Sequence, residues 1–362
     1  MSVLVGHLLP QRRPAGDRTW LAQLTIGLLI LALAAISALC LAWGASDASL
    51  MKLVLSLAGI ESFGSDMQFQ RDLIIIRDIR VPRIVLGGLI GASLAASGAV
   101  MQGLFRNPLA DPGLVGVSAG AGLGAATAII IGGPLVAAAS ISLFMLPLSA
   151  FCGSLIVTLT LYALATRRGL TSVATMLLAG IALGAMAGAF TGLLVYIADD
   201  GQLRELTFWL LGSLAGATWT KVLASGPIIF AALLVMPFLA RSLNAFALGE
   251  SGAHHLGIPV QRAKSVAVVT VAAATGSAVA VSGGIGFVGI VVPHLLRLAI
   301  GPDHRFLLPA SALLGACLLL LADALSRTIV APAELPIGIV TAAIGAPFFL
   351  WLLLRKRGLI DL

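Results

Sequence analysis

Ten apolar runs alternate with more polar segments along this chain. An α-helix rises about 1.5 Å per residue, so roughly 20 apolar residues cross the hydrocarbon layer of a bilayer. The pattern predicts one all-α unit over residues 1–362, with ten transmembrane helices and a polar tail at 1–20. The predicted helices cover residues 22–43, 84–104, 113–132, 143–165, 173–197, 219–240, 265–282, 286–300, 307–327 and 336–354.

Residues 241–264 form the one long, strongly polar segment in the second half of the chain. Leu243 and Phe246 recur at helical spacing, Gly249 interrupts the pattern, and a second short amphipathic turn ends at Leu256. A flexible linker would not need apolar residues at this spacing. We interpret the segment as a docking platform for a soluble partner.

The composition agrees with a polytopic membrane protein. Hydrophobic residues make up 59% of the 362 positions and charged residues only 10%. Soluble globular domains carry about 25% charged residues, so the missing charge indicates a lipid environment. We therefore expect a single transmembrane domain over residues 1–362.

The net charge of +7 does not indicate a nucleic-acid partner, because the basic residues are scattered at the ends of the predicted helices. Placing both termini in the cytoplasm puts fourteen of the 22 basic residues on that side. Cytoplasmic loops of membrane proteins carry such an excess of Lys and Arg. We therefore expect a multi-pass membrane protein with both termini in the cytoplasm.

Glycine is abundant, with 41 residues, and two sets recur at every fourth position. Spacing of four places small residues on one helix face, where they allow two helix backbones to approach closely. We expect both sets to pack helices together within a tight bundle. The sets are Gly116, Gly120 and Gly124, and Gly180, Gly184, Gly188 and Gly192.

Signatures of catalysis are missing from the sequence. It contains no Gly-x-x-x-x-Gly-Lys-Ser/Thr phosphate loop and no His-Glu-x-x-His metal spacing. His254 and His255 are adjacent, hence about 100° apart on a helix, and would not converge on one metal ion. We expect no cofactor bound by this chain and no enzymatic activity, so that any energy for transport comes from elsewhere.

Three segments together resemble the FecCD family, the membrane permeases of ATP-driven importers for iron–siderophores, heme and cobalamin. The first, Ile79–Ala125, contains IRVPR and RNPLADPG. The second, Ala247–Ile258, reads ALGESGAHHLGI. The third, Ile285–Leu354, contains IGFVGIVVPH and AELPIG. They occur in the order and at the spacings of the family, from about residue 70 onward.

The resemblance implies a complete importer around this subunit. Two permease copies, expected to be a homodimer, enclose the pathway, and two cytoplasmic ATPase subunits use ATP and magnesium. A periplasmic binding protein delivers the cargo. RNPLADPGLVGVSAGAGLGA resembles heme permeases more than cobalamin permeases, so heme is the favoured cargo, followed by a ferric siderophore and then cobalamin. The resemblance also implies a location in the bacterial inner membrane.

In this family the segment matching 241–264 folds into two short helices that contact the ATPase. Gly249 and Gly257 permit sharp turns, and Leu248 and Leu256 offer apolar side chains to a partner. Glu250 is placed to interact with the amino-terminal dipole of the second helix. The residues that match the family here, and that we expect to couple to the ATPase, are Ala247, Leu248, Gly249, Glu250, Leu256 and Gly257.

On the opposite side, Arg80 and Arg83 match arginines that bind glutamates of the binding protein in this family, and Arg327 matches a third. The planar guanidinium group holds a carboxylate in a bidentate manner. Asp323 lies in an apolar run, where an ionised carboxylate needs a partner. Arg327 is four residues further on, so we expect a structural Asp323–Arg327 pair along one helix face.

The polar sequence between the second and third predicted helices forms a turn on the cytoplasmic side. Two prolines and an Asn/Asp pair favour a rigid turn there. We expect it to shape the inner gate region or to act as a fold determinant. Its residues include Arg106, Asn107, Pro108, Asp111 and Pro112.

Two other functional classes remain as alternatives. An ion-coupled secondary transporter would need ionisable residues at mid-membrane, and the best candidate, Asp323, lies near a helix end. A membrane-embedded enzyme would need a convergent polar site, which the sequence does not indicate.

Overall fold

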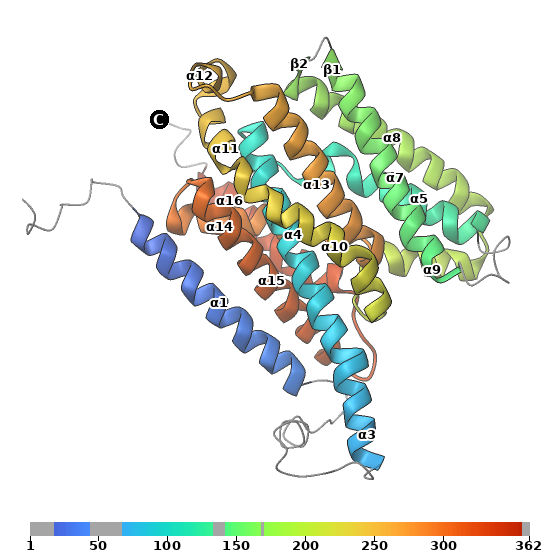
Figure 1. Ribbon diagram of the computed structural model, residues 1–362. Helices are drawn as coiled ribbons and strands as arrows, with labels where there is room; N and C mark the ends of the chain where they lie inside the picture. Colours follow the sequence, from blue (N-terminus) through green and yellow to red (C-terminus); the bar gives the residue numbers. More distant parts are fainter. Residues whose placement is uncertain (1–17, 44–66, 133–141, 168–169, 357–362) are drawn as a thin grey trace, which may run out of the picture.

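The computed structural model describes residues 18–43, 67–132, 142–167 and 170–356. Over these residues the chain is a helix bundle with one two-stranded hairpin (Figure 1). Residues 1–17 of the predicted tail lie outside these ranges. The elements are α1 (Thr19–Ala42), α3 (Met67–Ile74), a π-helical turn (Ile75–Arg80), α4 (Val81–Phe105), a 3₁₀ turn (Pro112–Val115), α5 (Val117–Thr127), a second π-helical turn (Ala128–Gly132), α7 (Ser142–Ala165), β1 (Thr166–Arg167), β2 (Leu170–Thr171), α8 (Val173–Ile197), α9 (Asp200–Leu210), α10 (Trp219–Val235), a second 3₁₀ turn (Met236–Leu239), α11 (Ala240–Phe246), α12 (Gly249–His255), α13 (Val260–Ser282), α14 (Val288–Ile300), α15 (His304–Thr328) and α16 (Ile337–Lys356).

The predicted set of ten membrane helices is confirmed. Within the described ranges, seven helices are long and apolar enough to cross a bilayer. Three shorter apolar helices, Val117–Gly132, Val288–Ile300 and Ile337–Trp351, complete the set. The prediction of a helix over 173–197 coincides with α8.

The largest difference from the prediction is at the second helix. α3, the π-helical turn and α4 form one continuous helix of 39 residues from Met67 to Phe105, whereas the apolar pattern predicted a start at residue 84. Arg71, Arg77 and Asp78 end the apolar run without ending the helix. Hydropathy detects only the part of a helix that lies in lipid, so the polar extension was missed.

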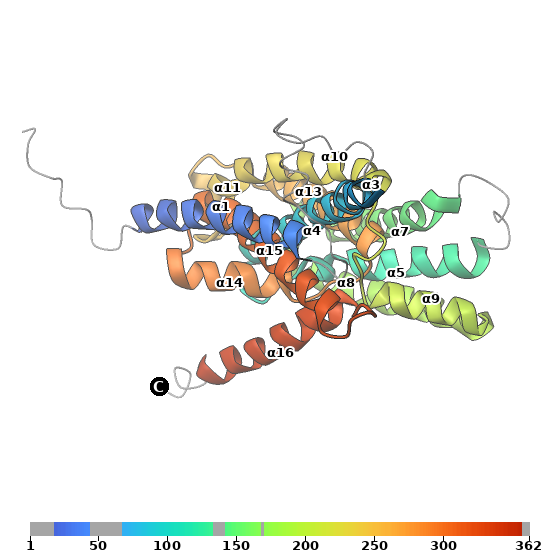
Figure 2. The same cartoon turned by 90° about the horizontal axis from the view of Figure 1, so that it is seen from below.

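Burial is unequal among the long helices. The spanning windows of α4 and α13 are 72% and 78% buried, whereas those of α1 and α8 are 6% and 22% buried. α4 packs most extensively against α15. α4 and α13 therefore form the centre of the bundle, and Figure 2 shows α16 extending away from the other helices.

At two helix–helix contacts, glycine lets the two backbones touch. We call such a contact a seam. A Cβ atom added at Gly120 would lie 2.4 Å from the carbonyl oxygen of Gly153, and one added at Gly91 would lie 2.3 Å from that of Gly315. These contacts join α5 to α7 and α4 to α15. By contrast, nothing lies within 4 Å of the equivalent position at Gly188 or Gly192 of α8. The expectation that both glycine sets pack within the bundle therefore holds for α5 and fails for this part of α8.

The helix α9 was not predicted from the sequence. Asp199 caps this helix, because its carboxylate accepts a hydrogen bond from the Gln202 N–H while the Gln202 side chain accepts one from the Asp199 N–H. This reciprocal pair is a capping box. The sequence signal was present in the Asp199-x-x-Gln202 spacing, but the segment is too short and too polar to resemble a membrane span.

Candidate functional site

The polar residues gather at two opposite ends of the bundle. Figure 1 shows α12 and the β1–β2 hairpin at one end and α3 at the other. We call these the α12 end and the α3 end. The predicted coupling segment belongs to the first, and the predicted docking arginines belong to the second.

At the α12 end, residues 241–264 contain the two short helices that the resemblance implied, α11 and α12. Gly249 begins α12 with φ +89°, and Gly257 follows it with φ +76°. Only glycine adopts such angles without strain. Ala247 and Leu248 connect the two helices, so the chain reverses sharply on both sides of α12.

The apolar residues of this segment divide into two groups. Leu243 and Phe246 are 1% and 3% exposed, and pack in the main hydrophobic core. Their own bundle covers them, so they are not docking residues. Leu248 and Leu256 are 70% and 55% exposed. These two side chains remain as an apolar surface on either side of α12.

Glu250 makes a contact that the sequence did not predict. Its Oε1 atom lies 2.7 Å from the Nζ atom of Lys264 in α13. Glu250 is in the first turn of α12, as expected for a favourable interaction with the helix dipole. The Lys264 side chain is only 3% exposed, whereas that of Glu250 is 46% exposed. The ion pair therefore holds α12 against α13, and the lysine of the pair is buried.

The predicted turn after α4 lies beside the coupling segment. Arg106 adopts a left-handed conformation with φ 50° and ends α4. The Asn107 side chain accepts a hydrogen bond from the Leu109 N–H at 3.0 Å, and Asp111 accepts one from the Gly113 N–H at 2.8 Å. Pro112 then begins a 3₁₀ turn. Burial raises the pKa of Asp111, although this hydrogen bond favours its charged form.

A cleft of about 430 Å³ joins this turn to the coupling segment. Arg106, Asn107 and Pro108 line it together with Leu243 and residues of α14. The structure thus brings two predicted sites together, although they are more than 130 residues apart in the sequence.

α11 is also held to the start of α15. The Asn244 amide donates to Asp303 Oδ1 at 2.8 Å, and its oxygen accepts from the His304 N–H at 2.9 Å. Burial alone would raise the pKa of Asp303, but hydrogen bonds from the Arg305 side chain and backbone and from Asn244 lower it to about 2. The carboxylate is therefore ionised at neutral pH. This anchor could not be predicted from the sequence, because Asn244 and His304 are 60 residues apart.

At the α3 end, the central contact is made by Arg83. Its Nη2 atom lies 2.8 Å from Asp323 Oδ1, and its Nη1 and Nη2 atoms each donate to Glu334 at 2.9 Å. The predicted partner of Asp323, Arg327, is also present, with its Nε atom 3.3 Å from Asp323 Oδ2. The outer ionic cluster thus contains Arg83, Asp323, Arg327 and Glu334, with two positive and two negative groups.

Glu334 was not predicted as a site residue, and the arginines are more buried than docking residues usually are. Arg80, Arg83 and Arg327 are 4%, 7% and 7% exposed. Arg80 donates to the carbonyl oxygens of Leu41 and Ala42 at the end of α1. Glu334 is the accessible member of the outer ionic cluster, with 31% of its side chain exposed.

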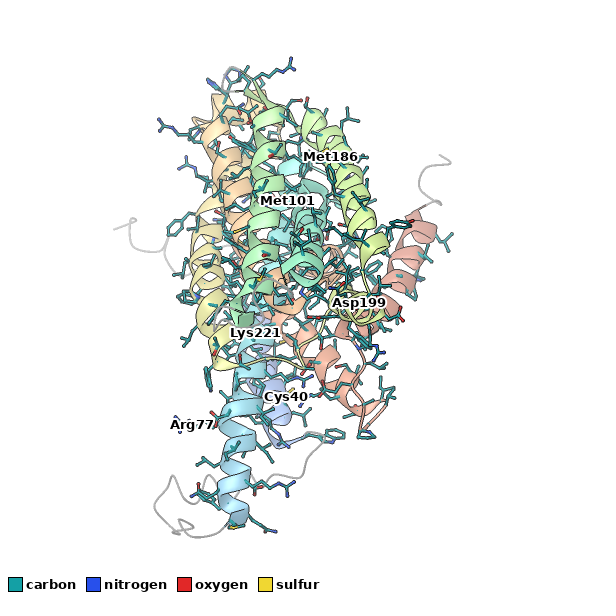
Figure 3. The ribbon with its side chains drawn as sticks, turned by 90° about the vertical axis from the view of Figure 1, so that its right-hand side faces the viewer. Cys40, Arg77, Met101, Met186, Asp199 and Lys221 are labelled. Atoms are coloured by element: carbon teal, nitrogen blue, oxygen red, sulfur yellow. The ribbon has the colours of Figure 1, made fainter. Side chains whose placement is uncertain are left out.

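Arg77 carries exposed positive charge at the α3 end. Figure 3 shows it on the side of the long helix, with the partly buried Lys221 on the neighbouring α10. The Trp219 indole N–H donates to the Arg77 carbonyl at 3.0 Å, which ties α10 to the π-helical turn.

No group of three His, Cys, Asp or Glu residues that could hold a metal ion occurs within the ranges described. His254 and His255 have ring centroids 6.5 Å apart and stand edge to face. The site is therefore best described as two polar surfaces at the ends of an apolar bundle.

The sequence matches the FecCD transport family over residues 25–355. It is 49% identical to the hemin transport system permease protein HmuU of Yersinia pestis over 280 residues, which are 77% of this chain and 83% of the relative. It is 44% identical to the vitamin B12 import system permease protein BtuC of an Escherichia coli strain over 313 residues, covering 85% and 93% of the two chains.

A cobalamin import system permease protein BtuC of Halobacterium salinarum is 46% identical over 280 residues, 77% of this chain and 73% of that one. Among solved structures, an inward-facing conformation assigned to a metal-chelate type ABC transporter superimposes with a TM-score of 0.79 and 31% identity, covering 91% of this chain and 98% of the other. With the ten membrane helices and two polar ends described above, these matches show that the chain belongs to the FecCD transport family.

Proposed function

We propose that this chain is the permease subunit of an ATP-driven importer and forms part of the pathway for an iron chelate across the inner membrane. The observation that carries the proposal is the family match over residues 25–355, which covers the whole membrane bundle. ATP hydrolysis is assigned to separate cytoplasmic subunits. In this proposal the α12 end faces the cytoplasm and both termini lie on that side.

The contact with the ATPase is assigned to α12 and the residues beside it. Leu248 and Leu256 are exposed on a segment that buried contacts hold firmly to the bundle. Exposed apolar residues at a polar end are typical of an interaction surface. A firmly held segment can transmit a displacement to the helices behind it, which a flexible loop cannot.

Hemin is the first candidate cargo, because the relative that transports it shares 49% of its residues with this chain. Cobalamin is the second candidate, because two of its permeases share 46% and 44%. A ferric siderophore is the third. The binding protein selects the cargo, so the small differences in identity set only the order of testing.

Reconstitution tests the proposed function. The permease, the ATPase subunits and the binding protein are placed in proteoliposomes, and uptake of hemin, cobalamin and a ferric siderophore is measured with and without ATP. We expect ATP-dependent accumulation of hemin. Accumulation against a gradient by the permease alone would contradict the proposal and favour a secondary transporter.

Docking of the binding protein is assigned to the α3 end, through Arg80, Arg83 and Arg327. Because Glu334 already binds Arg83, a carboxylate of the binding protein has to compete with it. We therefore expect Glu334→Gln to tighten docking, measured as the dissociation constant of the binding protein on nanodiscs. Asp78→Asn removes an exposed carboxylate from the same end and is the matched control. Equal effects of the two substitutions would contradict a direct role for Arg83.

We assign the contact with a second copy of the chain to the exposed side of α8. Figure 3 shows Met186 on this helix at the edge of the molecule. Gly188 and Gly192 leave that part of the backbone open, and small residues at this spacing favour close helix packing in membranes.

A further inference from the structure

The buried Lys264 lies between three separate elements at the α12 end. Its Nζ atom is 2.7 Å from Glu250 Oε1 in α12 and donates to the carbonyl oxygen of Thr171 in β2, also at 2.7 Å. Lys264 itself belongs to α13. One ammonium group therefore joins α12, α13 and the β1–β2 hairpin, using two of its three donors.

The hairpin is held through both backbone groups of Thr171, its N–H and its carbonyl. The Thr171 N–H donates to the Gln261 side chain at 2.9 Å, while its carbonyl oxygen accepts from Lys264. Gln261 and Lys264 lie one helical turn apart near the start of α13. This short stretch of backbone is thus fixed to α13 through both of its hydrogen-bonding groups.

The hairpin leads directly into α8. Thr171 is followed by Ser172, whose side chain caps α8 by accepting a hydrogen bond from the Thr175 N–H. The Ser172 N–H in turn donates to the Ala165 carbonyl at the end of α7. A displacement of Thr171 therefore acts on the first turn of α8. This helix is one of the least buried of the long helices described, so few contacts within the chain oppose its movement.

Elsewhere α12 and the hairpin are separated. A cleft of about 640 Å³ lies between them, lined by Leu170 of β2, by Ser251 and His254 of α12, and by the start of α13. Figure 1 shows α12 and the hairpin on either side of the upper end of α13. Polar contacts through Lys264 bridge this cleft.

From this arrangement, we propose that Lys264 is a positioning residue that transmits displacement of α12 to the hairpin and hence to α8. The inference rests on the proposed function, because it presumes that an ATPase moves α12. It assigns to Lys264 a role in coupling and none in hydrolysis or in cargo binding. Without the ammonium group, α12 can move while α8 does not follow.

The first test is the ratio of cargo uptake to ATP hydrolysis in proteoliposomes containing the full importer. Lys264→Met keeps the length of the side chain and removes its charge, and Glu250 can then be hydrated because it is half-exposed. We expect the ratio to fall at least about fivefold, the lower end of typical coupling energies. Lys264→Arg should recover most of the loss. Arg167→Met, which removes an exposed positive charge from the same hairpin, should leave the ratio unchanged.

A second variant keeps the test decisive if Lys264→Met folds poorly. Gln261→Leu removes only the other contact to Thr171, and we expect a smaller fall in the same ratio. Thermal unfolding of each purified variant shows whether the bundle is intact. An unchanged ratio in folded Lys264→Met or, if that variant does not fold, in Gln261→Leu would overturn the inference.

The second test follows the movement directly and needs no cargo. Spin labels at Ser251→Cys and Leu170→Cys, in a Cys152→Ser background, report the distance between α12 and the hairpin in the importer in nanodiscs. We expect one narrow distance distribution with and without a non-hydrolysable ATP analogue, and a broadened one in Lys264→Met. A broad distribution in the parent protein would contradict the link. A parent that shows the narrow distribution but imports no chelate would contradict the proposed function alone.

Discussion

The glycines of α5 and those of α8 have the same four-residue spacing but different surroundings. At Gly124 of α5, an added Cβ atom would lie 2.1 Å from the carbonyl oxygen of Ser149, and at Gly120 the nearest atom is also a backbone oxygen of α7. At Gly188 and Gly192 of α8, nothing lies within 4 Å. The first set closes a seam inside the chain, whereas the second leaves a surface open.

The difference shows that spacing indicates where two helices can approach, without indicating which helix is the neighbour. The α4–α15 seam adds a third case, because Gly91 and Gly315 meet there and the outer ionic cluster closes the α3 end of the same seam. Closed seams stabilise the bundle, whereas an open glycine surface is available for a contact outside it. Substitutions at each kind of seam test this comparison.

The largest effect is expected at the α5–α7 seam. Gly124→Val places methyl groups where the α7 backbone lies, and the overlap can be relieved only by separating the two helices. We expect little or no folded protein, measured as the monodisperse fraction after detergent extraction. Normal yield and thermal stability would show that the seam is looser than described.

The next largest effect is expected in the outer ionic cluster. Asp323→Ala removes the buried carboxylate that both Arg83 and Arg327 contact, and leaves Arg83 with only Glu334, whose side chain is 31% exposed. Breaking a buried ion pair in this manner destabilises a protein by about 3–5 kcal/mol. Unfolding in a denaturing detergent measures the change. A loss well below this range would mean that water already reaches the cluster.

At the open surface of α8, we expect Gly188→Val to leave the stability of the single chain within about 0.5 kcal/mol, as for a surface substitution. Assembly should nevertheless suffer, because the added side chain prevents close approach of a second helix. The dimer fraction, measured by light scattering, is expected to fall together with ATP-dependent uptake. An unchanged dimer fraction would mean that this surface contacts lipid and not a second copy of the chain.

The smallest effect on stability is expected for Glu334→Gln. This side chain is 31% exposed, so water can replace much of its contact with Arg83. The change in unfolding free energy should be about 1 kcal/mol or less. Since Asp323 remains, Arg83 keeps a buried partner. A loss as large as that of Asp323→Ala would mean that Glu334 holds the cluster together.

The membrane helices could be predicted because each long apolar run forms one helix. The prediction for α8 coincides with the structure, since Ser172 and Ala198 limit an uninterrupted apolar run. The two sharp turns around α12 could also be predicted, because Gly249 and Gly257 stand where the chain reverses.

The partners of the buried charges could not be predicted, because they depend on how distant segments pack. Lys264 resembles an ordinary basic residue at a helix start, and it is buried only because α12 folds back over α13. Glu334 binds Arg83 across 251 positions. The sequence indicated that Asp323 needed a partner, but it suggested only the neighbour on the same helix.

The continuous helix from Met67 to Phe105 is longer than a membrane is thick. At about 1.5 Å per residue its 39 residues extend about 58 Å, whereas the hydrocarbon layer measures about 30 Å. Roughly half of the length of this helix therefore lies beyond the acyl chains. If the helix tilts by about 10° about the point where it leaves the lipid, its outer end moves by about 5 Å. A small change of helix angle in the membrane therefore becomes a measurable displacement outside it.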